Sequence, residues 1–232
     1  MIDGIFVTGT DTGVGKTRVS VALLRTLTEM GHCCIGMKPV ACGCEHTPNG
    51  WRHGDALELM RASSIEVGYD EVNPYPLIEA IAPHLAARQM GVEIDIGRLS
   101  KQARELRARA DIVVVEGAGG LLVPLRDKQT QVDLIATLGL PILLVVGIRL
   151  GCLNHALLSL ESLLRRELPV MGWVANCCDG DMQYPDENIE TLRDMLDIPL
   201  LAVAGYAPDG RDDRLAQGIR TGLTTYLANP DE

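Results

Sequence analysis

A glycine-rich loop near the start of the chain constrains the fold more than any other feature of the sequence. Residues 9–17 read GTDTGVGKT and lie between a short apolar segment, residues 2–8, and residues 16–30, whose apolar positions follow one helical face. A strand, a glycine-rich turn and a helix in this order form a phosphate-binding loop, because free backbone N–H groups at the helix start face an anion. Lys16 then meets phosphate oxygens, and the Thr17 hydroxyl is offered to magnesium.

The loop meets the usual pattern G-x4-G-K-[ST] only approximately. Thr10 stands where that pattern has its first glycine, and Gly9 lies one residue early. A chance glycine-rich turn is the alternative, but the strand before the loop, the helix after it and the intact residues 15–17 favour a nucleotide site. Loops with two lysines carry the second one at the position of Asp11, so a further cation has to come from elsewhere in this chain.

Beyond the loop, apolar and helical patterns alternate along the chain. Apolar residues make up 47% and aromatic residues 3% of the 232 residues, so the core consists mainly of Val, Leu, Ile and Ala, as in parallel sheets covered by helices. Further strands are predicted at 33–40, 111–116, 141–147, 171–176 and 199–205, and further helices at 94–109, 132–138, 152–166, 185–196 and 212–227. The alternation predicts an α/β fold, one domain over residues 1–232 with a mainly parallel sheet, helices on both faces and ligands at the carboxyl ends of the strands.

Residues 41–91 interrupt this alternation. They are rich in Gly, Pro, His and Asn, and only short helices are predicted, at 55–62 and 83–89. An excursion of this kind beyond the end of a strand often carries substrate contacts.

Charge and cysteine usage exclude several classes of partner. The formal charge is −10 and no basic block is longer than the pair at 165–166, so we expect no nucleic-acid or membrane partner. The start of the chain lacks a secretory pattern, no apolar run is long enough to span a membrane, and we expect a cytoplasmic location. The seven cysteines are expected to be reduced thiols. A zinc site within residues 32–46 is the less favoured alternative, because no C-x2-C spacing occurs there.

Three charged residues lie near the predicted ligand edge of the sheet. Lys38 follows the second strand and is the candidate for the missing cation; an exposed surface lysine is an equal alternative. Glu116 closes a Val-rich strand and offers oxygens to magnesium, and the glycine-rich turn at 117–120 leaves room for a ligand, unless it is an ordinary tight turn. Asp55 precedes an apolar helical pattern and is equally well interpreted as a helix N-cap.

Two further segments carry polar groups at strand ends. Residues 150–155 begin a helix after a buried strand, so their free N–H groups suit a carboxylate, although Asn154 is also a candidate cap of that helix. Asn176 ends the next strand, where its amide suits an adenine edge or, equally, a turn.

These motifs occur in one order: FVTGTDT at 6–12, GKT at 15–17, KPV at 38–40, DAL at 55–57, VNPY at 72–75, VEGAGG at 115–120, LGCLNHA at 150–156 and GWVAN at 172–176. In this order they resemble the dethiobiotin synthetase family over nearly the whole chain. The resemblance implies a homodimeric cyclo-ligase with a P-loop NTPase-like fold. It implies that Mg²⁺ and ATP are used to close the ureido ring of 7,8-diaminononanoate (7,8-diaminopelargonate) with CO₂. One amine captures CO₂ as a carbamate, the γ-phosphate is transferred to it, and the second amine displaces phosphate to give dethiobiotin.

The same resemblance assigns roles to single residues. It implies that Lys16 and Lys38 are catalytic cations and that Thr17, Asp55 and Glu116 hold magnesium. The nucleotide contacts it implies are Gly13, Val14, Gly15, Lys16, Thr17, Arg18, Asp55, Glu116, Gly117, Ala118, Gly119, Asn176, Cys177, Gly205, Tyr206 and Ala207. The substrate contacts it implies are Thr12, Cys42 and, from the partner subunit to the substrate carboxylate, Gly151, Cys152, Leu153 and Asn154.

The chain departs from the family pattern at three positions. Cys42 replaces a frequent Ser, Gly205 replaces a frequent Pro, and Asn188 stands where some members have a carboxylate-binding Tyr. These departures bear on substrate bonding, nucleotide preference and carboxylate affinity.

Two other functions share the loop. A cobyrinic-acid-type amide ligase needs a glutamine-hydrolysing part, for which this chain has no room. A ParA- or MinD-like nucleotide switch calls for the second loop lysine and a basic or amphipathic terminus. This chain has Asp11 and the acidic end NPDE at 229–232 instead.

Overall fold

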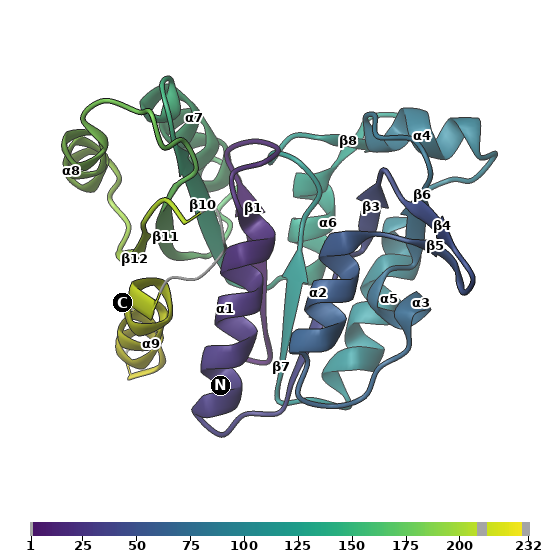
Figure 1. Cartoon of the computed structure of the whole chain (residues 1–232). Coiled ribbons are helices and arrows are strands. Elements are labelled where there is room, and N and C mark those ends of the chain that lie inside the picture. The colour runs from purple at the N-terminus through teal and green to yellow at the C-terminus, as the bar shows by residue number, and fades with distance from the viewer. Residues whose placement is uncertain (1, 208–212, 229–232) are drawn as a thin grey trace.

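A six-stranded parallel sheet forms the centre of the computed structural model, which describes residues 2–207 and 213–228 (Figure 1). Its strand order is β12-β11-β10-β1-β7-β2, and all five pairings are parallel. The strands are β1 (Gly4–Gly9), β2 (Cys34–Met37), β7 (Ile112–Glu116), β10 (Ile142–Ile148), β11 (Val170–Cys177) and β12 (Leu200–Ala204). The predicted α/β class with a mainly parallel sheet is therefore confirmed.

The sheet is apolar on both faces because both faces are covered. Every residue of β7 and β10 is buried, including Val113 to Val115 and the run Leu143 to Val146. Successive side chains point to opposite faces, so Ile5 and Val7 belong to one core cluster and Phe6 to another. A near-continuous apolar strand is what a sheet between two helical layers requires.

Helices cover each face in turn. On the face of Ile5 and Val7 lie α1 (Lys16–Glu29) and α9 (Asp213–Ala228). The opposite face carries α5 (Ile96–Arg107), α6 (Gln131–Leu138), α7 (Cys152–Leu164) and α8 (Pro185–Met195). Helices on both faces are thus confirmed. The predicted start of the last helix at Asp212 lies outside the described residues.

The excursion between β2 and α5 holds more structure than its sequence indicates, and its elements lie on the side of the sheet that ends in β2 (Figure 1). Its elements are β3 (Val40–Cys42), β4 (Glu45–Thr47), β5 (Gly50–Arg52), α2 (Gly54–Ala62), α3 (Tyr69–Val72), β6 (Tyr75–Leu77) and α4 (Pro83–Gln89). A second small hairpin, β8 (Pro124–Arg126) with β9 (Gln129–Thr130), follows β7.

The sequence predicts the second strand over 33–40 with its end at Lys38-Pro39; that end is confirmed, but Val40 does not belong to this strand. The strand β2 ends at Met37, and Val40 instead pairs with Tyr75 in a separate two-stranded sheet. Pro39 stands between the two strands and has no N–H to donate to a ladder, which favours the break. The turn leaves Lys38 at the carboxyl end of β2, where its backbone N–H donates to Val72.

All seven cysteines lie in the described part of the chain, and each is a free thiol. Within residues 2–207 and 213–228, no three His, Cys, Asp or Glu side chains are grouped so that they could hold a metal ion. Cys33 lies before the start of β2, whereas Cys42 and Cys44 lie beyond its other end, so this strand separates the cysteines of the considered zinc cluster. None of the helices in those same residues is long and apolar enough to cross a bilayer.

Candidate active site

The loop between β1 and α1 leaves an anion-binding helix end open. Gly15 is the residue before α1 and has φ +89°, in the left-handed region that favours glycine. A Cβ added there would stand 2.2 Å from Nδ2 of Asn176. No side chain of the described residues caps α1, so its first backbone N–H groups and the positive end of its dipole are available to a phosphate.

Asn176 stabilises this loop by hydrogen bonds. Its Nδ2 donates to the carbonyl of Val14 at 2.8 Å, and its Oδ1 accepts from the Arg18 guanidinium at 2.8 Å. Arg18 also donates to the carbonyl of Gly205 at 2.9 Å. The structure therefore brings four of the predicted nucleotide residues together. Because Asn176 lies within β11, the alternative of a turn residue is wrong.

Lys16 and Asp11 face each other within the loop. Lys16 is 6% exposed, and its ammonium donates to the backbone carbonyl of Asp11 at 2.8 Å. Burial and the nearby charge of Lys38 lower the pKa of Lys16 to about 8. The Asp11 carboxylate forms an ion pair with Arg149, just after β10. Sequence reasoning missed Arg149, although its place after a buried strand at the ligand edge was a usable signal.

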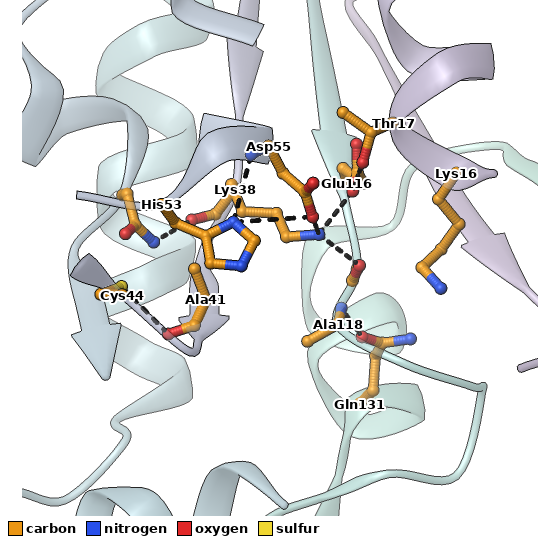
Figure 2. Close-up of polar contacts among 12 residues, drawn as sticks. Lys16, Thr17, Lys38, Ala41, Cys44, His53, Asp55, Glu116, Ala118 and Gln131 are labelled. Atoms are coloured by element: carbon orange, nitrogen blue, oxygen red, sulfur yellow. Dashed lines mark hydrogen bonds and ion pairs between the residues drawn. The ribbon is translucent and has the colours of Figure 1, made fainter. Parts of the chain in front are cut away.

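Lys38 lies at the centre of a buried ionic cluster (Figure 2). Its Nζ stands 2.9 Å from Oδ2 of Asp55, donates to Oε1 of Glu116 and reaches the carbonyl of Gly117 at 3.3 Å. The side chain is 5% exposed, so the alternative of a surface lysine is wrong. Burial by itself lowers the pKa of Lys38, but the carboxylates of Glu116 and Asp55 outweigh it and raise that pKa. The ammonium therefore stays charged.

The two acids of the cluster also face Thr17 and the phosphate loop. The Thr17 hydroxyl donates to Oε1 of Glu116 at 2.8 Å, while Oε2 of the fully buried Glu116 has no hydrogen-bond partner among the described residues. Burial raises the pKa of Asp55, but the adjacent Lys38 ammonium prevails and lowers it. A hydroxyl, a carboxylate and an unpartnered carboxylate oxygen fit a hard cation such as Mg²⁺.

The alternative that Asp55 is a helix N-cap is wrong. The N-cap of α2 is His53, whose Nδ1 accepts from the backbone N–H of Asp55 at 3.1 Å. Asp55 lies in the first turn of the helix, and its side chain points to Lys38 (Figure 2). His53 itself was missed, because histidine is an uncommon cap and the sequence marks Gly54-Asp55 instead.

A cavity of about 480 Å³ opens beside the cluster. Six predicted site residues line it: Thr12, Lys38, Cys42, Asp55, Ala118 and Gly119. Its remaining walls include His53 and the apolar residues Ile81 and Val123, which the sequence did not indicate. Burial raises the pKa of the Cys42 thiol to about 11, against a smaller opposite effect of Lys38, so the thiol is neutral. The cavity thus joins a charged end to an apolar end.

Gln131 fixes the glycine turn that follows Glu116. Its Oε1 accepts from the backbone N–H of Ala118 at 2.6 Å, and its Nε2 donates to Gly120 O and Thr8 Oγ1, each at 3.2 Å. A Cβ on Gly117 would stand 2.5 Å from Oε1 of Gln131. The turn is therefore shaped by a side chain, a role that no sequence pattern marks.

The start of α7 lies outside the Lys38 cavity but near it. A neighbouring hollow of about 410 Å³ shares Thr12 and Val123 with that cavity and is also lined by His155 and Leu158 of α7. Gly151 precedes the helix with φ +92°, and no side chain in the described part of the chain caps it, so the alternative that Asn154 is the cap is wrong. None of the residues 151–154 lines either space.

One further predicted nucleotide residue, Tyr206, lies near Gly13 of the loop. Tyr206 lines a third hollow, of about 480 Å³, with Gly13 and Arg149. Cys177 ends β11, and Ala207 lies next to Tyr206 in the sequence.

Comparisons with known proteins identify the family of the chain and relate its fold to solved structures. A family model described as an AAA domain matches residues 3–211. An ATP-dependent dethiobiotin synthetase BioD of Nitrosospira multiformis is 50% identical over 212 residues, which cover 90% of this chain and 92% of the relative. The protein of the same name from Aromatoleum aromaticum is 46% identical over 215 residues, or 93% and 96% of the two chains.

Solved structures of lower identity share the fold. The MinC:MinD cell division protein complex of Aquifex aeolicus matches with TM-score 0.62 and 16% identity, covering 97% of this chain and 96% of the matched chain. Cobyrinic acid a,c-diamide synthase of Mycobacterium smegmatis matches with TM-score 0.56 and 13% identity, covering 100% and 97%. At these identities the likeness concerns the fold alone.

Proposed function

The chain belongs to the ATP-dependent dethiobiotin synthetase family, and on that premise we propose that it closes the ureido ring of 7,8-diaminononanoate with CO₂ and ATP. One observation carries this proposal beyond family membership. Lys38 lies between Asp55 and Glu116, next to the phosphate loop, and also lines a cavity with Thr12 and Cys42. A single buried cation thus adjoins both the nucleotide site and a space for a second substrate.

ATP is proposed to bind along the loop from Gly13 to Arg18. The open start of α1 would hold its phosphates, with the Lys16 ammonium on the β- and γ-oxygens. The purine would lie toward Asn176, Cys177 and residues 205–207. The hydrogen bonds among Asn176, Arg18 and Gly205 support this, because they join the loop to that side of the sheet.

Thr17, Asp55 and Glu116 are proposed to hold Mg²⁺. The unpartnered Oε2 of buried Glu116 supports this, since an isolated buried carboxylate oxygen is costly. When bound there, the ion would neutralise negative charge on the phosphate oxygens.

The ligation itself needs positive charge, because an anionic carbamate has to approach an anionic phosphate. One amine of the substrate adds to CO₂, loses a proton and becomes a carbamate. A carbamate oxygen then attacks the γ-phosphorus and ADP leaves. The ammonium groups of Lys38 and Lys16 would stabilise the negative charge of both partners. The second amine attacks the carbonyl carbon, phosphate leaves with the former carbamate oxygen, and the ring closes.

The substrate is proposed to lie in the cavity beside Thr12, Cys42 and the turn at 117–119. Its alkyl chain would pack on the apolar walls, and its carboxylate would reach the first N–H groups of α7, residues 151–154, of a partner subunit. A homodimer is part of this proposal, as are one catalytic domain over 1–232 and a cytoplasmic location. The seven free thiols support the location.

The test is direct. Purified protein given the diamine, bicarbonate and Mg-ATP is expected to form dethiobiotin, ADP and phosphate in equal amounts, measured by mass spectrometry and phosphate release. A protein that binds ATP yet forms no dethiobiotin would contradict the proposal. ADP release that does not depend on the diamine would favour a nucleotide switch instead.

A further inference from the structure

Lys38 and Asp55 meet from two separate segments that lie outside the central sheet. Lys38 follows β2 in the turn toward β3, and Asp55 lies in the first turn of α2, after the hairpin of β4 and β5. Their charged atoms nevertheless stand 2.9 Å apart. Since electrostatic stabilisation requires groups that are already in place, both segments have to be held by further contacts.

We propose that Tyr69 and Asn73 are positioning residues, which hold Lys38 and Asp55 at their working separation. They stand at the two ends of the short helix α3: Tyr69 begins it and Asn73 follows its last residue. The inference rests on the proposed function, because it concerns the same cations and acids.

Asn73 holds the Lys38 segment. Its Nδ2 donates to the carbonyl of Lys38 at 2.7 Å, and the backbone N–H of Lys38 donates to the carbonyl of Val72 at 2.8 Å. The end of α3 therefore binds both backbone polar groups of the catalytic lysine. Asn73 is 1% exposed, so water does not compete for these bonds.

Tyr69 holds the Asp55 segment. Its hydroxyl accepts from the backbone N–H of His53 at 2.8 Å, and His53 in turn caps α2 by accepting from the N–H of Asp55 at 3.1 Å. The same hydroxyl donates to Oδ1 of Asn73 at 3.1 Å. A continuous chain of hydrogen bonds thus joins the start of α2 to the carbonyl of Lys38.

The donor and acceptor roles in this chain of hydrogen bonds are fixed. A backbone N–H only donates and a carbonyl only accepts, so the Tyr69 oxygen has to accept from His53 and its proton has to go to Asn73. The Asn73 amide must then present its oxygen to Tyr69 and its N–H to Lys38. Loss of any member interrupts this chain and removes a hydrogen bond from one of the two segments.

Tyr75 offers a matched control for Tyr69. Both residues are buried, at 6% and 8% exposure, and each hydroxyl accepts a backbone N–H, for Tyr75 that of Asp95 at 3.0 Å. A guanidinium lies over each ring, at 4.0 Å for Tyr69 and 5.1 Å for Tyr75. The Tyr75 hydroxyl, however, leads to the start of α5 and not to Lys38.

The experiment compares Tyr69→Phe with Tyr75→Phe in steady-state ring closure and in urea unfolding. We expect Tyr69→Phe to lower kcat about tenfold, with the KM for ATP within about twofold, because a small misplacement of catalytic groups costs rate. Tyr75→Phe also removes a hydrogen bond to a backbone N–H and should lose stability, but it should keep its kcat within about twofold. Asn73→Asp keeps the oxygen for Tyr69 but loses the donor to Lys38, and should lower kcat as well.

The inference would be overturned by an unchanged kcat in Tyr69→Phe, or by an equal loss of kcat in both tyrosine variants. Crystal structures of the two variants give a readout that does not depend on activity. The distance from Lys38 Nζ to Asp55 Oδ2 should exceed 4.0 Å, the limit for an ion pair, in Tyr69→Phe only; a retained 2.9 Å would overturn the inference. If the unaltered protein forms no dethiobiotin, the proposed function fails, and these distances still decide the positioning role.

Discussion

Replacement of Lys38 by Met removes the charge at the centre of the site while it keeps most of the side-chain length. Two effects are expected, and they have separate causes. Glu116, fully buried, loses its cation, as does Asp55 on the side of the cavity. Breaking a buried pair at one partner typically destabilises by about 3–5 kcal/mol, and Asp55, with its side chain 35% exposed, should contribute little of this because water screens it.

The second effect is on turnover. A donor aimed at developing charge contributes roughly 3–4 kcal/mol, so kcat should fall by about 10² to 10³. ATP affinity should stay within about threefold, because Lys16 and the open end of α1 still hold the phosphates. Phosphate release in steady state gives kcat, titration calorimetry gives ATP affinity, and urea unfolding gives stability.

The double variant Lys38→Met with Glu116→Gln separates these effects. Neutralising both partners removes the uncompensated buried charge, so stability should recover by at least about 2 kcal/mol relative to Lys38→Met. Turnover should not recover, because the cation is still absent. A Lys38→Met protein with kcat within about threefold of the parent would refute the catalytic role, and a double variant no more stable than the single one would refute the buried-charge argument.

Two further predictions concern the phosphate loop. In the protein without nucleotide, the pKa of Lys16 is lowered to about 8, and bound phosphates favour the charged form of its side chain. Nucleotide binding above pH 8 should therefore be accompanied by uptake of a proton. ATP affinity should then fall by up to about tenfold per pH unit above 8, as calorimetry in buffers of different ionisation enthalpy can measure; a flat profile, or an equal fall in Lys16→Arg, would contradict this. Gly15→Ala should abolish nucleotide binding, because its Cβ would stand 2.2 Å from Asn176 at φ +89°. Gly13→Ala has φ +73° but nothing within 4 Å of the added Cβ, so it should retain far more binding, and equal losses would show that backbone strain alone decides.

The positions of two charged residues followed from the strand ends in the sequence. Lys38 and Glu116 could be placed because parallel strands bring their carboxyl ends to one edge of the sheet, and both now lie there. What failed was the local detail around them. The N-cap that was one interpretation of Asp55 is provided by His53, and Val40, predicted within the second strand, belongs to a different strand beyond Pro39.

The missed residues have a common property. Tyr69, Asn73, Gln131 and Arg149 act through partners far away in the sequence, such as Asn73 on Lys38 and Gln131 on Thr8. A periodic pattern reports which side of an element is apolar, but it carries no information on which buried polar groups pair. Such pairing is specified only when the elements pack.

The sequence by itself determined the order of strands and helices, the phosphate loop and the family, since these depend on local pattern and on motifs in series. Only the tertiary structure decided that Lys38 is a buried cation between two acids and that Asp55 points at it. The pKa of Lys16 in the phosphate loop is lowered because folding removes its side chain from water and places it near Lys38. Charge state and catalytic geometry depend on burial and distance, and both arise from contacts between segments that the chain order keeps apart.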